Sequence, residues 1–294
     1  MFEGVSVAVV TPFRNGEVDD AAFRALVDRL FEMGIDGIVA TGSTGEAATL
    51  TREERRRVVA AAVEEARGRG FVVAGTGTND TAVSIDYSRD ARDVGADGLM
   101  IVTPYYNKPS PAGLEAHYRA ISQAAGLPIV VYNVPGRTGY NLPPALAARL
   151  ATVPNVVAIK EASGSVDQGM DVMTAAPGLT FLSGEDSLTL PLLAAGAKGV
   201  VSVAGHLIGD TIRAMIDAHE RGDVAMARQL QRTVLAVTRA MFLESNPGPV
   251  KYAMSRLGWM TNELRPPLAP VTPETAAQID AVLDGLGAGL TRAC

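Results

Sequence analysis

The sequence contains very little cysteine and histidine. Its single cysteine, Cys294, is the last of 294 residues, which excludes an internal disulfide framework and a cysteine-based metal site. The three histidines, at positions 117, 206 and 219, include no pair at the spacing that places two metal ligands on one helix face. We therefore predict a protein that needs no metal and no other cofactor.

An excess of positive charge is also absent. The chain has 26 lysines and arginines against 32 aspartates and glutamates, a formal net charge of −6, and no basic run. This balance argues against nucleic acid or an anionic membrane surface as a partner. No apolar stretch approaches the roughly 20 residues of a membrane span, and no basic segment precedes an apolar one at the N-terminus. We therefore expect no secretory signal and a cytoplasmic location.

Lysine is scarce, because only four of the 26 basic residues are lysines, at positions 108, 160, 198 and 251. All the other basic residues counted here are arginines. Apolar residues are plentiful by contrast: they make up 47% of the chain, enough for a sizeable core.

Short apolar runs rich in β-branched residues recur at residues 5–10, 37–40, 71–74, 98–102, 129–132, 156–159, 179–182 and 199–203. The runs are continuous rather than alternating, which is typical of parallel strands with both faces covered. Amphipathic helical patterns separate them, at residues 20–33, 52–67, 81–94, 111–125, 143–150, 166–175, 188–194 and 210–221.

Local signals mark where several of these helices begin and end. Thr51 with Glu54, and Ser165 with Gln168, have the spacing of a capping box. Pro111 stands at a first helical position, which suits proline. Helix ends are predicted at the glycines in positions 34, 95, 126 and 196.

Eight strand–helix units predict an α/β fold, a (β/α)₈ TIM barrel that closes near residue 223. An open doubly wound sheet is the alternative, but eight parallel strands favour closure. The remaining residues have helical patterns at 224–242, 249–257 and 272–286. We therefore predict a catalytic barrel over residues 1–223 and a C-terminal helical appendage over residues 224–294. No flexible linker separates the two, so the appendage should pack on the barrel.

The active site of such a barrel lies at the carboxyl ends of its strands, and Lys160 ends the sixth run. Arginine keeps its proton near neutral pH, whereas burial can lower the pKa of lysine from about 10.4 by several units. A neutral amine attacks a carbonyl to form an imine, the chemistry of class I aldolases. The alternative is a lysine that reaches the rim of the barrel or pairs with Glu161.

Two other strand ends carry groups that suit this chemistry. Tyr132 ends the fifth run, where its phenol could transfer protons to and from Lys160, or could simply be a core tyrosine. Ser43 and Thr44 lie between Gly42 and Gly45 in a segment that offers hydroxyls for a proton relay and backbone N–H groups for a carboxylate, although most such segments are plain turns.

Arg137 follows the fifth run in a turn formed by Pro135 and Gly136. Its guanidinium suits bidentate binding of a substrate carboxylate, and a surface arginine is the alternative. Tyr105 and Tyr106 are adjacent aromatics after the fourth run, where they could form a wall of the site or a subunit contact.

Together these segments resemble a known family. Residues 42–46 (GSTGE), 103–109 (TPYYNKP), 132–139 (YNVPGRTG), 159–162 (IKEA) and 246–251 (NPGPVK) are similar to those of the dihydrodipicolinate synthases, and the resemblance extends over essentially the whole chain. The first segment also occurs in N-acetylneuraminate lyases and 2-keto-3-deoxy sugar acid aldolases of the same superfamily. The segment that contains Arg137 distinguishes the synthases from these relatives, because its arginine resembles the synthase ligand for the aspartate semialdehyde carboxylate.

The resemblance implies condensation of pyruvate with aspartate 4-semialdehyde to 4-hydroxy-tetrahydrodipicolinate, on the route to diaminopimelate and lysine. It implies that Lys160 forms the pyruvate imine, that Tyr132 transfers protons and that Thr44 binds the pyruvate carboxylate. Ser43 would relay protons where many members have threonine. Val201 would offer its carbonyl near the lysine.

The resemblance also implies an assembly. Tyr106 would complete the proton relay from a neighbouring subunit, which requires a dimer, usually within a homotetramer. Members of the family that lysine inhibits hold the lysine ammonium with a glutamate at the dimer interface, and this chain has Val83 there, while Asn79 and Tyr105 match. Arg52 and Arg55 stand where some inhibited members carry histidine. We therefore predict weak or absent inhibition by lysine.

Two other functions stay open. The first is a sugar acid aldolase or N-acetylneuraminate lyase with the same Lys160 imine and a different aldehyde. The second, from another class, is a catalytically silent barrel that binds a keto acid. The intact Lys160, Tyr132 and relay hydroxyls argue against the second.

Overall fold

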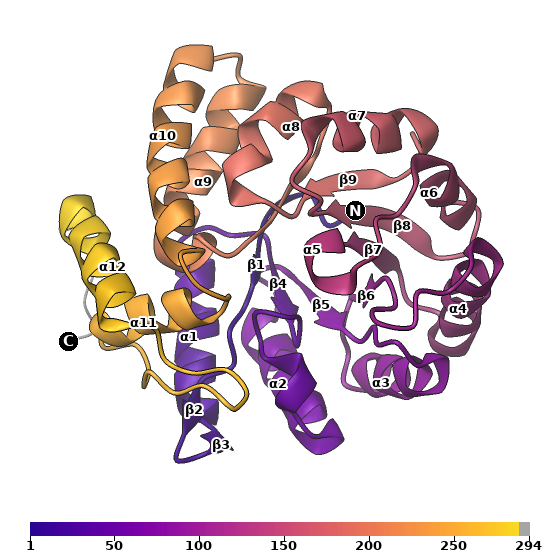
Figure 1. The fold of residues 1–294 in the computed structure, drawn as a ribbon, viewed down its shortest axis with the longest axis horizontal. Helices are drawn as coiled ribbons and strands as arrows, with labels where there is room; N and C mark the ends of the chain where they lie inside the picture. The colour runs from indigo at the N-terminus through magenta and orange to yellow at the C-terminus, as the bar shows by residue number, and fades with distance from the viewer. Residues whose placement is uncertain (288–294) are drawn as a thin grey trace.

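Eight parallel strands close into a barrel in the computed structural model, which describes residues 1–287 (Figure 1). Each strand pairs with its neighbours in parallel, and the first and last strands pair with each other to complete the ring. The strands are β1 (Gly4–Ala8), β4 (Gly37–Ala40), β5 (Phe71–Gly75), β6 (Gly98–Val102), β7 (Ile129–Asn133), β8 (Val156–Glu161), β9 (Thr180–Ser183) and β10 (Gly199–Ser202). The predicted TIM barrel is therefore confirmed, and the open sheet is wrong.

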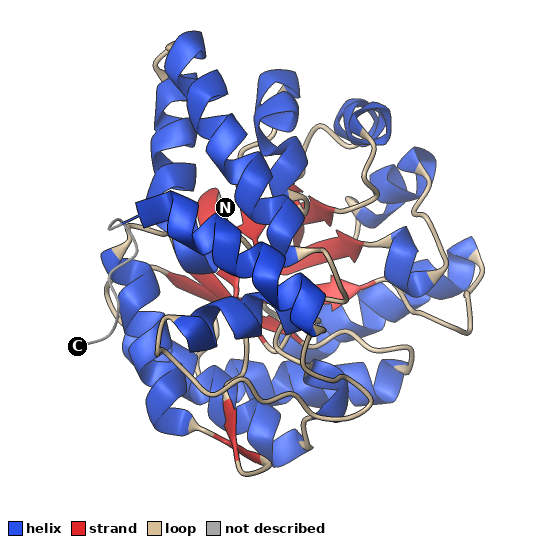
Figure 2. Cartoon of the chain, turned by 60° about the vertical axis from the view of Figure 1, so that its left-hand side comes forward, coloured by secondary structure: helices blue, strands red, loops and turns tan. Residues whose placement is uncertain are grey.

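Helices cover the outside of the strands, as Figure 2 shows. Those of the barrel are α1 (Asp20–Glu32), α2 (Arg52–Ala66), α3 (Thr81–Asp93), α4 (Pro111–Ala125), α6 (Pro144–Leu150), α7 (Val166–Ala175), α8 (Thr189–Ala195) and α9 (Gly205–Glu220). The last begins earlier than the predicted residue 210, because a turn before the kink at Ile208 joins it. Among the described residues, no helix has both the length and the apolar character that crossing a bilayer requires.

The predicted helix signals hold with one exception. Thr51 and Glu54 form a complete capping box. The Ser165 side chain accepts a bond from the Gln168 backbone, but the Gln168 amide donates to the carbonyl of Leu142 instead of reaching back to the cap. The second half of that predicted box is therefore wrong. Left-handed backbone at the end of a helix is confirmed for the glycines at 34, 95, 126 and 196.

The core has two layers. One cluster of buried side chains fills the barrel and includes Tyr132 and Val201, while a larger cluster lies between strands and helices. Every residue of β4 is buried, as its continuous apolar run predicted. Covered strand faces thus explain why the runs do not alternate.

The C-terminal residues form the three predicted helices: α10 (Val224–Met241), α11 (Gly248–Arg256) and α12 (Pro273–Leu286). Helix α10 packs along α9, and α11 packs on both α10 and α12 (Figure 1). The division into two domains at residue 223 stays a prediction, and Cys294 lies outside the described residues.

Several short elements were missed. A hairpin of β2 (Phe13–Arg14) and β3 (Glu17–Val18) precedes α1, and a one-turn helix α5 (Pro135–Thr138) follows β7. Asn15 and Gly16 both have positive φ in the hairpin turn, and the pair is a strong hairpin signal that the sequence displays. Elements of two to four residues are too short to show a periodic pattern.

Candidate active site

Lys160 lies inside the barrel. Residues alternate between the two faces of a strand, so Ala158 in the interior cluster places Lys160 on the inner face of β8, and Ile159 in the outer cluster places Glu161 on the other. The Glu161 carboxylate accepts hydrogen bonds from the Asn133 amide at 2.9 and 3.1 Å and from the backbone of Ser163 at 2.7 Å. The alternative pairing of Lys160 with Glu161 is therefore not the arrangement adopted.

Burial changes the acidity of this lysine. Lys160 is 5% exposed, and desolvation lowers its pKa from 10.5 to about 8. The carboxylates of Asp186 and Glu185 oppose the shift, and the Arg137 guanidinium adds to it. A substantial fraction of the amine is consequently neutral near physiological pH, as a nucleophile requires.

Tyr132 lies directly beside Lys160, since the two residues are register partners on β7 and β8. The Lys160 Nζ is 4.1 Å from the centre of the Tyr132 ring. Burial raises the pKa of Tyr132 to about 12, and Arg137 and a hydrogen bond with Ser43 only partly offset that effect. The phenol therefore keeps its proton near neutral pH, where it can donate it beside the amine.

The loop after β4 brings Ser43 and Thr44 to the same place. Ser43 is exposed, whereas Thr44 is buried and its hydroxyl accepts a hydrogen bond from the Asn246 amide at 2.8 Å. A Cβ on Gly45 would lie 3.1 Å from the carbonyl oxygen of Val9, so this glycine lets the loop approach β1 closely.

These side chains surround one cavity. A space of about 90 Å³ reaches Lys160 and is lined by Ser43, Thr44, Tyr132, Arg137, Glu185, Phe242 and Asn246 among others. A wider space of about 410 Å³ shares Ser43, Tyr132, Arg137 and Asn246 and extends to Tyr105. Arg137 is exposed and donates to the backbone carbonyl of Asn246 at 3.2 Å, which leaves most of its guanidinium donors for a ligand. The arrangement provides a nucleophilic amine, a phenol and cationic and hydroxyl ligands for carboxylates.

The sequence profile described as the dihydrodipicolinate synthetase family matches residues 1–286. The chain belongs to this family. A 4-hydroxy-tetrahydrodipicolinate synthase of Trichlorobacter lovleyi is 47% identical over 284 residues, 96% of this chain and 98% of the relative. The crystal structure of dihydrodipicolinate synthase from Aquifex aeolicus has a TM-score of 0.95 at 39% identity, covering 98% of this chain and 99% of that one.

A further solved relative is a chloride-inhibited dihydrodipicolinate synthase from Acinetobacter baumannii, in complex with pyruvate. Its TM-score is 0.95 at 38% identity, and the match covers 98% of this chain and 99% of that chain. The resemblance inferred from the sequence motifs is thus confirmed as family membership.

The roles that the resemblance implies for Tyr106 and Val201 stay predictions. Tyr106 is 90% exposed, has left-handed backbone, and lines neither of the two spaces around Lys160. Val201 lies in the interior cluster on β10, and the role of its carbonyl stays a prediction.

The sequence assigned no role to Asn246 or Glu185, although Asn246 lies in one of the segments that carry the family resemblance. Asn246 belongs to the appendage and contacts Thr44 and Arg137, which lie more than a hundred residues earlier. Glu185 lines the cavity, and burial raises the pKa of its carboxyl. Gly184 is also required, since a Cβ there would lie 2.6 Å from the Ala162 Cβ and 3.1 Å from the Lys160 Cε.

Proposed function

We propose that the protein is a 4-hydroxy-tetrahydrodipicolinate synthase that condenses pyruvate with L-aspartate 4-semialdehyde through an imine on Lys160. The observation that carries the proposal is the buried Lys160 amine beside the Tyr132 phenol, in one cavity with Thr44 and Arg137. Family membership and the names of the relatives support the same reaction.

The chemistry balances with these groups. The neutral Lys160 amine adds to the pyruvate C2 carbonyl, and loss of one water gives the imine. Removal of a C3 proton gives an enamine. Its C3 forms a bond to the aldehyde carbon, while the aldehyde oxygen takes up a proton and becomes the hydroxyl group of the product. The amino group of the semialdehyde then displaces Lys160 from C2, which closes the ring and restores the free amine.

Each remaining side chain has a proposed role. Tyr132 gives a proton to the carbinolamine oxygen as water leaves, and Ser43 passes protons onward. Thr44 binds the pyruvate carboxylate through its hydroxyl and backbone N–H. Arg137 binds the semialdehyde carboxylate, and the Val201 carbonyl lies toward Lys160. No metal or other cofactor takes part in this scheme.

The proposal extends to assembly and location. We propose a cytoplasmic homotetramer built from dimers, in which Tyr106 of each subunit completes the relay in its neighbour. The 90% exposure of this aromatic side chain supports a partner surface there.

One experiment tests the function against both alternatives. The protein is incubated with pyruvate and borohydride and then digested. Mass spectrometry searches the peptides for the reduced imine, an N-(1-carboxyethyl)lysine, whose added mass is that of pyruvic acid minus one oxygen atom. Turnover is measured in parallel with aspartate semialdehyde and with sugar acids. An adduct on Lys160 with turnover of the semialdehyde is expected. No adduct would contradict any imine enzyme, and turnover of a sugar acid alone would favour the aldolase.

We expect kcat/KM for pyruvate to rise as the pH increases through about 8. The lowered pKa of Lys160 means that about half of the amine is neutral at this pH, whereas an ordinary lysine would still be protonated. Initial rates from about pH 6 to about pH 11 measure the profile. An inflection near the ordinary value of 10.5 would contradict the assignment of Lys160 as nucleophile.

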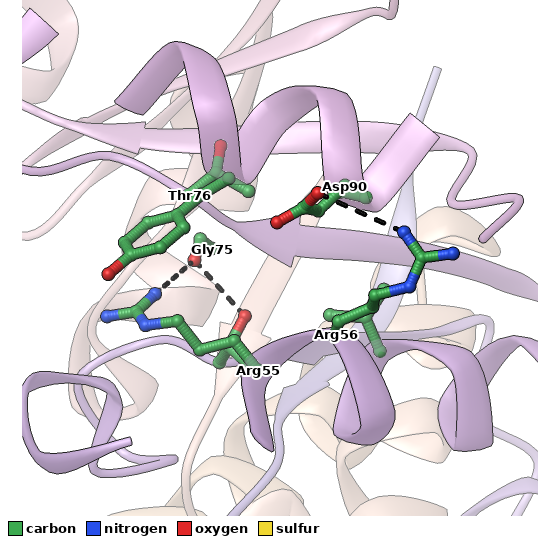
Figure 3. A pocket seen from close by; sticks show the side chains of 9 residues that line it. Arg55, Arg56, Gly75, Thr76 and Asp90 are labelled. Atoms are coloured by element: carbon green, nitrogen blue, oxygen red, sulfur yellow. Dashed lines mark hydrogen bonds and ion pairs between the residues drawn. The ribbon is translucent and has the colours of Figure 1, made fainter. Parts of the chain in front are cut away.

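We expect free lysine to inhibit the enzyme weakly or not at all. Val83 is an exposed apolar residue at the start of α3, and it cannot hold an ammonium group. Arg55 adds positive charge nearby, and it donates to the carbonyl of Gly75 at 3.3 Å (Figure 3). Its guanidinium also stacks on the Tyr87 ring, 4.4 Å from the ring centre. Arg52 adds further positive charge, although it forms an ion pair with Asp90.

Rates with increasing lysine measure this effect in the wild type and in Val83→Glu, which supplies the missing carboxylate. The variant should be inhibited at lower lysine than the wild type. Wild-type inhibition at sub-millimolar lysine would show the prediction to be wrong.

A further inference from the structure

The best-buried ion pair of the described residues joins the appendage to the barrel, and neither of its residues lines the space that reaches Lys160. Lys251 on α11 donates to the Glu46 carboxylate, and both side chains are 0% exposed. Lys251 also donates to the backbone carbonyl of Glu263 at 2.9 Å and lies 4.2 Å above the centre of the Phe13 ring. The second Glu46 oxygen accepts from the backbone of Arg265 at 3.0 Å. The ammonium and both carboxylate oxygens therefore each have a hydrogen-bond partner.

Glu46 ends the loop that carries Ser43 and Thr44. Its backbone is left-handed, with φ of 51°, a conformation in which surrounding contacts must hold a residue that has a side chain. Its N–H donates to the Ser43 carbonyl at 3.1 Å, and its own carbonyl accepts from the Thr49 backbone at 3.0 Å. The position of the Glu46 side chain is thus coupled directly to the path of the loop.

A second contact joins the same two segments. Asn246, shortly before α11, donates to the Thr44 hydroxyl at 2.8 Å, and its carbonyl accepts from Arg137. Lys251 follows on the first turns of α11. One short stretch of the appendage therefore contacts both the hydroxyl proposed to bind pyruvate and the residue that ends its loop.

We propose that Glu46 and Lys251 are positioning residues for catalysis, whose ion pair fixes the Ser43–Thr44 loop against the Lys160 cavity. This role rests on the proposed function. Replacing a buried ion pair by apolar residues often leaves stability unchanged, so stability alone does not account for such a pair. Charge-assisted hydrogen bonds are directional, so they fix the distance and angle between α11 and the loop. Apolar contacts have no such direction.

The decisive variant replaces both partners together, as Glu46→Gln with Lys251→Met. A single replacement leaves one charge buried without a partner and can prevent folding. In the double variant the glutamine still accepts from the Arg265 backbone, and the methionine packs on the Phe13 ring. We expect a folded protein with an unchanged pH profile and a KM for pyruvate raised at least about tenfold, because the loop that carries Thr44 loses one of its two contacts with the appendage.

A matched control lies on the same helix. Arg256 on α11 pairs with Asp280 on α12 at 2.8 Å, and these side chains are 53% and 32% exposed. The double variant Arg256→Met with Asp280→Asn removes an ion pair of the appendage without touching the loop. It should keep the wild-type KM for pyruvate.

The conservative variant Glu46→Asp keeps the negative charge but shortens the side chain by one methylene. It tests the positioning role if the double variant does not fold. It should raise the KM for pyruvate, whereas a merely structural role would alter thermal stability and leave KM unchanged. A wild-type KM in whichever of these variants folds would overturn the positioning role. Absence of wild-type turnover would instead overturn the proposed function, so the two failures are distinguishable.

Discussion

Lys160→Met is expected to abolish turnover and to make the protein more stable. The loss in kcat/KM should be at least about 10,000-fold, the scale on which removal of a covalent nucleophile acts. The gain in stability follows from the pKa of this buried amine, which is lowered from 10.5 to about 8. Since the unfolded chain binds the proton more tightly, the protonated amine opposes folding below about pH 8, and this penalty disappears as the pH rises to 10.5.

Methionine matches the length of lysine and carries no charge. At pH 7 the free energy of unfolding should therefore rise by something of the order of 3 kcal/mol, and the gain should vanish at high pH. Denaturant unfolding at both pH values, together with steady-state rates, measures both effects. Lys198→Met is the control, because replacing this exposed lysine should change neither the free energy of unfolding nor the steady-state rate. Substantial remaining activity in Lys160→Met would rule out the imine mechanism.

Tyr132→Phe is expected to lower kcat by about 100- to 1,000-fold, the range in which a positioned proton donor contributes. The phenyl ring keeps the packing against Lys160, where the amine lies 4.1 Å from the ring centre, so the loss isolates the hydroxyl. Imine formation with pyruvate should be slower but should still reach Lys160. Rates of borohydride trapping and steady-state kinetics give the two readouts.

Tyr118→Phe is the matched control for this substitution. The Tyr118 hydroxyl is fully buried and donates to the Ile101 carbonyl at 2.7 Å, away from the cavity. Its loss should cost about 1 kcal/mol of stability and leave kcat unchanged. Equal effects of the two substitutions on kcat would contradict a proton-transfer role for Tyr132.

Local sequence patterns alone predict much of this fold. Continuous apolar runs predicted strands with two covered faces, and the capping box of Thr51 and Glu54 predicted the start of α2. The second predicted box failed because Gln168 found a distant partner, the carbonyl of Leu142. Such competition between local and distant hydrogen bonds is not visible in sequence spacing.

The candidate site could be predicted in part. Scarcity of lysine and the end of a strand together singled out Lys160, and register on adjacent strands then placed Tyr132 beside it. The role of Asn246 could not be found in this way, because its contact with Thr44 spans 202 residues. The same holds for Lys251 and Glu46, which are 205 residues apart.

The sequence by itself determined the barrel and the order of its main elements, and it singled out Lys160 as the candidate nucleophile, because these depend on periodicity and residue chemistry. Only the tertiary structure decided how acidic that lysine is, since its pKa depends on the removal of water from around the amine. It also decided that the segment between α10 and α11 lines the cavity, through Phe242 and Asn246. Packing α11 against the barrel is what brings an amide and an ammonium group to a loop near the other end of the chain.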